Sequence, residues 1–176
     1  MLNIPNILTL ARIGLLPIIA YWMYLDMPLC ALILYIICAL TDFFDGWLAR
    51  KLNAVSDFGT FFDHIADKIF VAALLLVMVD LGTLGGLWLI PIAIIISREF
   101  FISGLREFLG PKNVKLPASM TAKWKTTVQM IALALLIAAP LSGHILLAGH
   151  ITLLIASALT VISGWSYARE GFKHMG

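Results

Sequence analysis

The stretch TDFFDGWLARKLNAVSDFGTFFDHIADK (residues 41–68) decides the fold, because it places five aspartates inside a strongly apolar chain. Of all residues, 61% are hydrophobic and only 12% are charged, and the mean hydropathy is +0.99. This composition excludes an ordinary soluble domain. It predicts an all-α membrane protein with one domain over residues 1–176. Carboxylates at membrane depth are rare and costly, so the aspartates indicate a functional site.

Six apolar segments lie along the chain, each close to the roughly 20 residues that span a bilayer. They begin near Ile7, Pro28, Phe58, Leu84, Ala122 and Ile145. We therefore predict six transmembrane helices. Before the first of them, Asn3 as a helix N-cap and Pro5 in the first turn predict a short interfacial helix.

Lysine and arginine residues gather at alternate ends of these segments. The loops 25–28, 80–86 and 140–145 contain neither residue type. By the positive-inside rule, both termini are then cytoplasmic. We expect a multi-pass protein of the inner, cytoplasmic membrane whose site faces the cytoplasm. Its expected partners include the lipid bilayer and no nucleic acid.

Four of the aspartates fall at matching depths on two neighbouring helices. The short turn centred on Ala54 makes the second and third helices antiparallel. Asp45 and Asp63 lie nine residues from that centre, while Asp42 and Asp67 lie twelve and thirteen residues from it. At 1.5 Å rise per residue, the carboxylates form two layers about 5 Å apart.

Small residues accompany the carboxylates on the same or adjoining helix faces. Gly46, Ala49 and Gly59 leave room for a ligand or for close backbone approach. Four ionised carboxylates cannot face one another in a low-dielectric site without compensation. Three interpretations remain open: a solvated patch at the helix ends, a proton or ion pathway, or two divalent cations bridging a phosphate.

The spacing D-x-x-D-G-x-x-A-R, eight residues, G-x-x-x-D-x-x-x-D resembles the signature of the CDP-alcohol phosphatidyltransferase family. Every fixed position is filled, by Asp42, Asp45, Gly46, Ala49, Arg50, Gly59, Asp63 and Asp67. The resemblance implies six membrane helices, a cytoplasmic site, a homodimer and transfer of a phosphatidyl group from CDP-diacylglycerol to an alcohol.

Three further segments resemble a bacterial branch of this family whose acceptor is sn-glycerol 3-phosphate. They are NIPNILTLARI (residues 3–13), SREFFISGLREF (residues 97–108) and KWKTTVQM (residues 123–130). His64 departs from the branch, which usually has proline there, and this leaves the helix shape near the aspartates open. Another acceptor, inositol phosphate or phosphatidylglycerol, is the alternative within the family. A small cation or proton transporter is the alternative outside it.

The resemblance also implies a role for each residue of the site. Two divalent cations, Mg²⁺ or Mn²⁺, are held by Asp42, Asp45, Asp63 and Asp67. Asp67 is also the catalytic base that takes the proton of the attacking hydroxyl. The implied CDP-diacylglycerol site comprises Gly46, Ala49, Arg50, Gly59, Asn6 and Thr9. The implied glycerol-phosphate site comprises Arg98, Arg106, Lys123 and Lys125.

Simpler interpretations accompany the last two groups. Asn6, Thr9 and Arg12 recur every three residues. They either face the nucleotide and its phosphates or belong to a plain capped helix without a role in binding. The basic residues of the implied glycerol-phosphate site are also suited to anchoring at anionic headgroups. Arg98 lies within an apolar run, so we expect it to face a ligand or an ionic partner, for which Glu99 is a candidate.

Overall fold

The computed structural model describes residues 4–51, 57–110 and 120–173, and the side chains from Thr9 onward except those of residues 42–51, 57–61, 63 and 64. Within these ranges the chain forms six α-helices and two 3-10 turns, with no strand. The elements are α1 (Ile4–Tyr24), α2 (Pro28–Lys51), α3 (Asp57–Asp80), η1 (Gly86–Trp88), α4 (Leu89–Leu109), α5 (Met120–Ile137), η3 (Ala139–Leu141) and α6 (Gly143–Phe172). The prediction of an all-helical fold is therefore confirmed.

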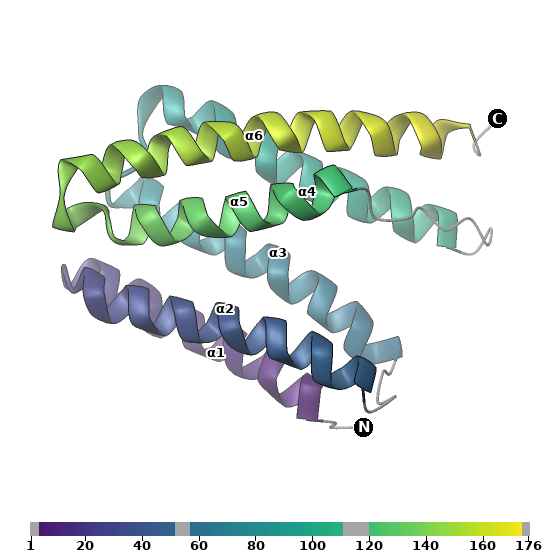
Figure 1. Ribbon diagram of the computed structural model, residues 1–176, viewed down its shortest axis with the longest axis horizontal. Coiled ribbons are helices and arrows are strands. Elements are labelled where there is room, and N and C mark those ends of the chain that lie inside the picture. Colours follow the sequence, from purple (N-terminus) through teal and green to yellow (C-terminus); the bar gives the residue numbers. More distant parts are fainter. Residues whose placement is uncertain (1–3, 52–56, 111–119, 174–176) are drawn as a thin grey trace.

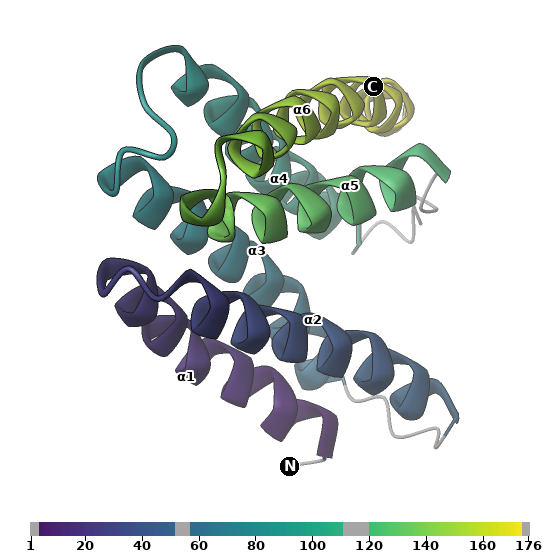
Figure 2. The same ribbon diagram turned by 60° about the vertical axis from the view of Figure 1, so that its left-hand side comes forward.

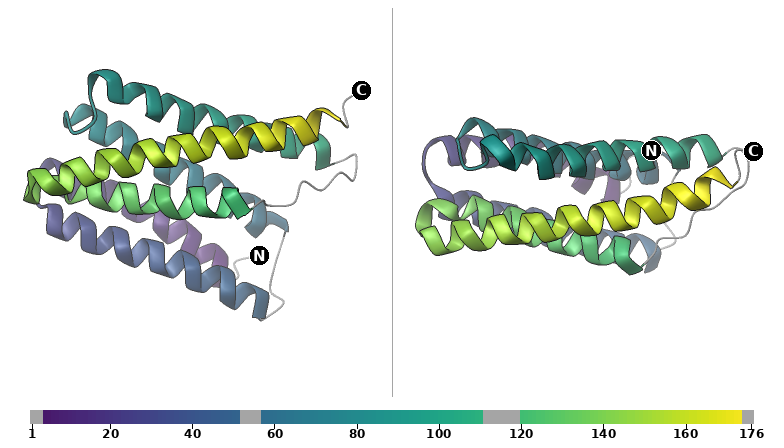
Figure 3. Two further views of the ribbon diagram at one scale, coloured as in Figure 1. Left: turned by 45° about the horizontal axis from the view of Figure 1, so that its top comes forward. Right: turned by 90° about the horizontal axis from the view of Figure 1, so that it is seen from above.

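Successive helices run in opposite directions through the molecule (Figure 1). The turns that follow α1, α3 and α5 lie at one end, and the first residues of α1 lie with the last residues of α6 at the other (Figure 3). The turns without lysine or arginine thus share one end, as the charge pattern predicts. Helix α3 lies between the α1–α2 pair and the group formed by α4, α5 and α6 (Figure 2).

Two boundaries differ from the predicted ones. No separate interfacial helix precedes α1 in the described residues, because Ile4 and Pro5 already form its first turn, where proline's missing N–H is not needed. The fourth helix begins at Leu89 rather than near Leu84. Gly82 and Gly86 adopt positive φ angles of 74° and 59°, which interrupt helical geometry, and the turn tucks Leu84 into the core.

The core is an apolar cluster at the centre of the helices, and Tyr35 connects three of them. The Tyr35 hydroxyl donates a hydrogen bond of 2.9 Å to the carbonyl oxygen of Met130 on α5. Its ring stacks on Phe70 of α3 with the ring centroids 5.9 Å apart. Tyr35 thereby joins α2, the helix that carries the first two aspartates of the motif, to α3 and α5.

Helix α6 has its small and polar residues inside and its large apolar residues outside. The buried face includes Gly149, Ala156, Ser157, Thr160, Ser163, Gly164 and Gly171. The exposed face includes Leu147, Ile151, Leu154, Ile155, Val161, Ile162 and Trp165. This distribution is the reverse of a soluble helix and is typical of packing between helices in lipid. Among the described residues, Gly86–Leu109 and Gly143–Phe172 are long and apolar enough to cross a membrane.

The contact between α5 and α6 is close at Gly149, and a larger side chain there should weaken the fold. A Cβ at Gly149 would lie 3.0 Å from Leu136 Cδ2 and 3.3 Å from the Leu136 backbone nitrogen. We expect Gly149→Leu to force the helices apart and to lower the free energy of unfolding in detergent by about 1–3 kcal/mol. Thermal unfolding of the purified protein measures this effect.

Gly14 of α1 provides the matched control. A Cβ at Gly14 would meet no heavy atom of the described residues within 4 Å. Gly14→Leu should leave the unfolding midpoint unchanged or raise it, because leucine favours the helix over glycine. Equal midpoints for the two variants would contradict the close approach of α5 and α6.

Candidate active site

The aspartates of the motif lie on two consecutive helices, as the sequence predicts. Asp42 and Asp45 belong to the last half of α2, and Asp63 and Asp67 to the first half of α3. Seven of the eight fixed positions of the motif have side chains outside the described ones, namely Asp42, Asp45, Gly46, Ala49, Arg50, Gly59 and Asp63. The side chains of Asn6 and His64 also lie outside them. Asp67, the last aspartate of the motif, is described, and it gives the position of this part of the site.

Asp67 forms an ion pair with Arg12 of α1. Arg12 Nη1 donates to Asp67 Oδ1 at 2.7 Å. The Arg12 side chain is 4% exposed, whereas the Asp67 side chain is 52% exposed. Thr9, one turn before Arg12 on the same helix, is buried too. A buried arginine thus binds one oxygen of the Asp67 carboxylate, while about half of the Asp67 side chain remains exposed to solvent.

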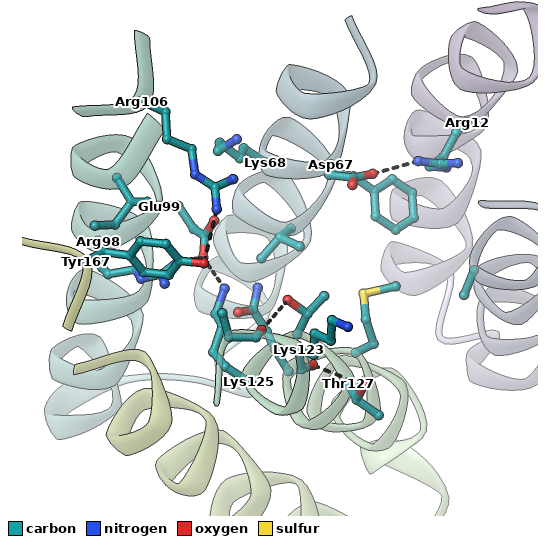
Figure 4. Close-up of a pocket in the computed structure, with 18 of the residues that line it drawn as sticks. Arg12, Asp67, Lys68, Arg98, Glu99, Arg106, Lys123, Lys125, Thr127 and Tyr167 are labelled. Carbon is teal, nitrogen blue, oxygen red and sulfur yellow. Dashed lines mark hydrogen bonds and ion pairs between the residues drawn. The ribbon is translucent and has the colours of Figure 1, made fainter. Parts of the chain in front are cut away.

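A cavity of about 630 Å³ opens beside this pair. Figure 4 shows Asp67 and Arg12 on one side of it and Arg106 with Tyr167 on the other. Residues from all six helices line the cavity, among them Arg12, Cys38, Asp67, Arg98, Lys125 and Tyr167. All four basic residues of the predicted glycerol-phosphate site line it, namely Arg98, Arg106, Lys123 and Lys125. The structure therefore brings the predicted base and the predicted phosphate-binding residues to one space.

Glu99 organises part of the basic wall. Its Oε1 accepts from Lys125 Nζ of α5, in a direct ion pair, and from Arg98 Nη1 at 3.4 Å. The Lys125 side chain is 4% exposed and that of Glu99 18% exposed, so the pair is largely shielded from water. The expectation that Glu99 pairs with Arg98 is confirmed. Lys125 is its second partner, and a buried charge needs such pairing.

Tyr167 of α6 holds the two arginines of α4. Its ring centroid lies 5.6 Å from Arg98 Cζ and 5.1 Å from Arg106 Cζ, within the range of cation–π attraction. Arg106 Nη2 donates to the Tyr167 hydroxyl oxygen at 3.2 Å. Arg98 Nη2 donates to Ser163 Oγ at 3.1 Å, and a Cβ at Gly164 would lie 3.0 Å from Arg98 Cγ. One face of α6 therefore determines where both guanidinium groups lie.

Several residues of the cavity received no role from the sequence. Tyr167 lies near the end of an apolar helix, where an aromatic residue is equally typical of the membrane interface. Lys68 and Gln129 also line the cavity without belonging to the predicted site. Lys123 also lines the cavity, but its side chain is exposed.

Comparison with known proteins identifies the family of the chain. The sequence profile of the CDP-alcohol phosphatidyltransferase family matches residues 2–162. The chain belongs to this family. Proteins named CDP-diacylglycerol–glycerol-3-phosphate 3-phosphatidyltransferase are similar to it over nearly their whole length. The one from Rickettsia bellii is 42% identical over 178 residues, with 98% of this chain and 97% of the relative covered.

More distant relatives of the same name extend this similarity. The protein from Bacillus subtilis is 38% identical, and that from Cereibacter sphaeroides 35% identical, each with 98% of this chain and 97% of the relative covered. The chain is thus a transferase of the CDP-alcohol phosphatidyltransferase family, and the transporter alternative loses its support. Its apolar helices agree with the membrane character of the family.

Members of the CDP-alcohol phosphatidyltransferase family use divalent cations, and the donors available here suit them. The four aspartates offer hard carboxylate oxygens, which Mg²⁺ and Mn²⁺ prefer. Among the described residues no group of three or more His, Cys, Asp or Glu could hold a metal, and three of the four predicted ligands have side chains beyond that description. The exposed carboxylate of Asp67 fits the role of a fourth ligand at the edge of such a site.

Proposed function

We propose that this protein transfers the phosphatidyl group of CDP-diacylglycerol to sn-glycerol 3-phosphate, giving phosphatidylglycerophosphate and CMP. The observation that carries the proposal is the cavity in which Asp67 faces a separate wall of arginine and lysine. A reaction between two phosphate-bearing substrates needs two anion sites, one at the aspartates and one apart from them. The names of the relatives point to the same pair of substrates.

In this reaction Asp42, Asp45, Asp63 and Asp67 hold two divalent cations, Mg²⁺ or Mn²⁺. When bound, the metals neutralise the pyrophosphate and stabilise the departing CMP. The remaining chemistry belongs to the protein. Asp67 accepts the proton of the attacking glycerol hydroxyl, whose oxygen bonds to the lipid phosphorus as the bond to CMP breaks. No covalent phosphatidyl-enzyme is required.

Arg12 positions Asp67 for this step. Its charge-assisted hydrogen bond to Oδ1 restricts rotation of the carboxylate. Because Arg12 is buried, this restraint comes from the packed interior and is present before substrates bind. Pre-orientation of a base lowers the barrier to proton transfer.

The phosphate of the acceptor binds at the basic wall. Arg106 and Arg98 offer guanidinium forks suited to a phosphate, and Tyr167 holds both against free rotation. Lys125 adds a positive charge, and its ion pair with Glu99 fixes the position of the Lys125 ammonium group. Lys123 completes the group proposed for this phosphate. The nucleotide side of CDP-diacylglycerol binds near the motif, at Gly46, Ala49, Arg50, Gly59, Asn6 and Thr9.

We propose a membrane arrangement on the charge pattern of the chain. Six helices cross the cytoplasmic membrane with both termini and the aspartates on the cytoplasmic side. The homodimer remains a proposal that rests on the family resemblance. Support comes from the basic-free turns, which share one end of the molecule opposite the aspartate-bearing ends of α2 and α3. In this arrangement the acyl chains stay in the bilayer while the soluble acceptor arrives from the cytosol.

An acceptor exchange tests the choice of substrate. Purified protein is supplied with CDP-diacylglycerol and Mg²⁺, and CMP release is measured with glycerol 3-phosphate, inositol phosphate or phosphatidylglycerol as the alcohol. Of the three alcohols, we expect only glycerol 3-phosphate to support CMP release. Release with another of these alcohols and none with glycerol 3-phosphate would retain the family chemistry and refute the proposed acceptor.

Arg106→Ala should mainly raise the KM for glycerol 3-phosphate. The substitution removes a binding contact that ground state and transition state share, so kcat should change little. Loss of a charged hydrogen bond predicts an increase of about 10- to 100-fold in KM. Steady-state kinetics with each substrate varied in turn measures it.

Arg169→Ala is the control for Arg106→Ala, because Arg169 is an exposed arginine near the same end of the protein. It removes the same charge from the headgroup region without touching the cavity. Its kinetics should match the unaltered protein. An Arg106→Ala variant that loses only affinity for CDP-diacylglycerol would show that the two pockets are assigned the wrong way round.

A further inference from the structure

Gln129 is a buried polar residue of the cavity to which the reaction described above gives no role. It lies on α5, is 4% exposed and lines the cavity one helical turn after Lys125. Its Oε1 has no hydrogen-bond partner among the residues that the structure describes. Buried amide oxygens are rarely left unpaired in native proteins, so such an atom indicates a partner that the protein itself does not supply.

Two arginines of the same cavity also keep hydrogen-bonding capacity that their contacts within the described residues do not use. Arg98 Nε and Arg106 Nε are buried donors without a partner in the described part of the chain. Both side chains line the cavity, and a phosphate bound there adds acceptors for their guanidinium groups. A hydroxyl group beside Gln129 gives its amide a hydrogen-bond partner, so a ligand with a phosphate and a hydroxyl fits this space.

We propose that the carboxamide of Gln129 recognises the second hydroxyl of the acceptor, the one that does not attack the lipid phosphorus. This inference rests on the proposed function, since it assigns the acceptor's phosphate to the neighbouring arginines and Lys125. Side chains four residues apart on a helix have Cβ atoms about 6 Å apart. The phosphate and the middle hydroxyl of the acceptor are carried by adjacent carbons, so side chains that share one helix face can contact both, the phosphate at Lys125 and the hydroxyl at Gln129.

The terminal amide of glutamine turns easily, because its last torsion has a broad minimum. Rotation about this bond directs the amide oxygen toward the cavity, where it accepts a hydrogen bond from the hydroxyl group of the acceptor. An acceptor without this hydroxyl leaves the buried amide unpaired, and enzymes discriminate strongly on that basis. Gln129 is thus a specificity-determining residue for a polyol phosphate over a simple hydroxyalkyl phosphate.

The test compares sn-glycerol 3-phosphate with 3-hydroxypropyl phosphate, which lacks only the middle hydroxyl. CMP release gives kcat/KM for both acceptors in the unaltered protein, in Gln129→Met and in Gln129→Glu. We expect the unaltered protein to prefer glycerol 3-phosphate by about tenfold or more, the value of one hydrogen bond to a buried partner. Gln129→Met should lose this preference, and Gln129→Glu, which keeps an acceptor oxygen, should retain it.

The matched control is Thr127→Val, on the same helix and also beside the cavity. The Thr127 hydroxyl already donates to the Lys123 carbonyl oxygen, so its removal should leave the preference unchanged. If Gln129→Met cannot be purified, Gln129→Asn withdraws the amide by one methylene and should weaken the preference in the same direction.

Equal use of the two acceptors by the unaltered protein would overturn the inference and leave the proposed function standing. Equal losses with both acceptors in Gln129→Met would also overturn it, because they would show a structural role alone. Absence of CMP release from the unaltered protein with either acceptor would overturn the proposed function and this inference together.

Discussion

Asp63→Asn is expected to abolish the release of CMP from CDP-diacylglycerol. The substitution keeps the size of the side chain and removes one negative charge from the proposed metal site. Metal-dependent phosphoryl chemistry relies on the cations to stabilise the charge that develops on the leaving group. We expect kcat to fall by about 10³-fold or more, and the apparent affinity for Mn²⁺ to fall with it.

Asp57 provides the control, because it belongs to the same stretch but to no fixed position of the motif. Asp57→Asn removes the same charge from the first residue of α3 and should retain most of the activity. Titration of Mn²⁺ followed by its paramagnetic signal measures metal affinity independently of turnover. Near-normal activity of Asp63→Asn in saturating metal would refute the role of Asp63 as a ligand.

Arg12→Leu is expected to lower kcat by about 10- to 100-fold. It removes the buried group that donates to Asp67 at 2.7 Å. Removing one member of a close charge pair typically costs about 2–5 kcal/mol, and the exposure of Asp67 places the effect at the lower end. The carboxylate remains present but loses its orientation, so the effect falls on turnover rather than on substrate affinity.

Two further variants separate this role from a contribution to folding. Arg12→Lys keeps the charge without the guanidinium geometry and should restore activity in part. In the Asp67→Asn background, Arg12→Leu should have little additional effect, because the two residues act as one unit. An Arg12→Leu protein with unchanged kcat and a lowered unfolding midpoint would show that Arg12 serves stability alone.

The helices were predictable because apolar length and turn chemistry are local properties. The two helices that carry the motif end at Lys51 and begin at Asp57, at equal distances from the predicted turn centre Ala54. The fourth α-helix begins at Leu89, a few residues after the start of its apolar segment near Leu84, because Gly82 and Gly86 adopt positive φ angles where the turn folds back on the core. Apolar periodicity contains no information about such a reversal.

The two helices that carry the four aspartates were predictable, because the short turn between them and their fixed spacing are local features. The contacts between distant helices around the cavity were not. Arg12 lies 55 residues from Asp67 in the chain, and Arg106 lies 61 residues from Tyr167. Both contacts depend on which helix faces which, and pattern within one helix does not determine that. Glu99 was foreseen as a partner of Arg98, its neighbour in sequence, whereas Lys125 as its second partner required the packing of α4 near α5.

The most direct test of the central claim is CMP release by the purified protein supplied with CDP-diacylglycerol. The release is followed with and without sn-glycerol 3-phosphate, first in Mg²⁺ and then in EDTA. The proposed reaction predicts release only when glycerol 3-phosphate and the metal are present together. Release that persists in EDTA, or that is indifferent to glycerol 3-phosphate, would contradict it.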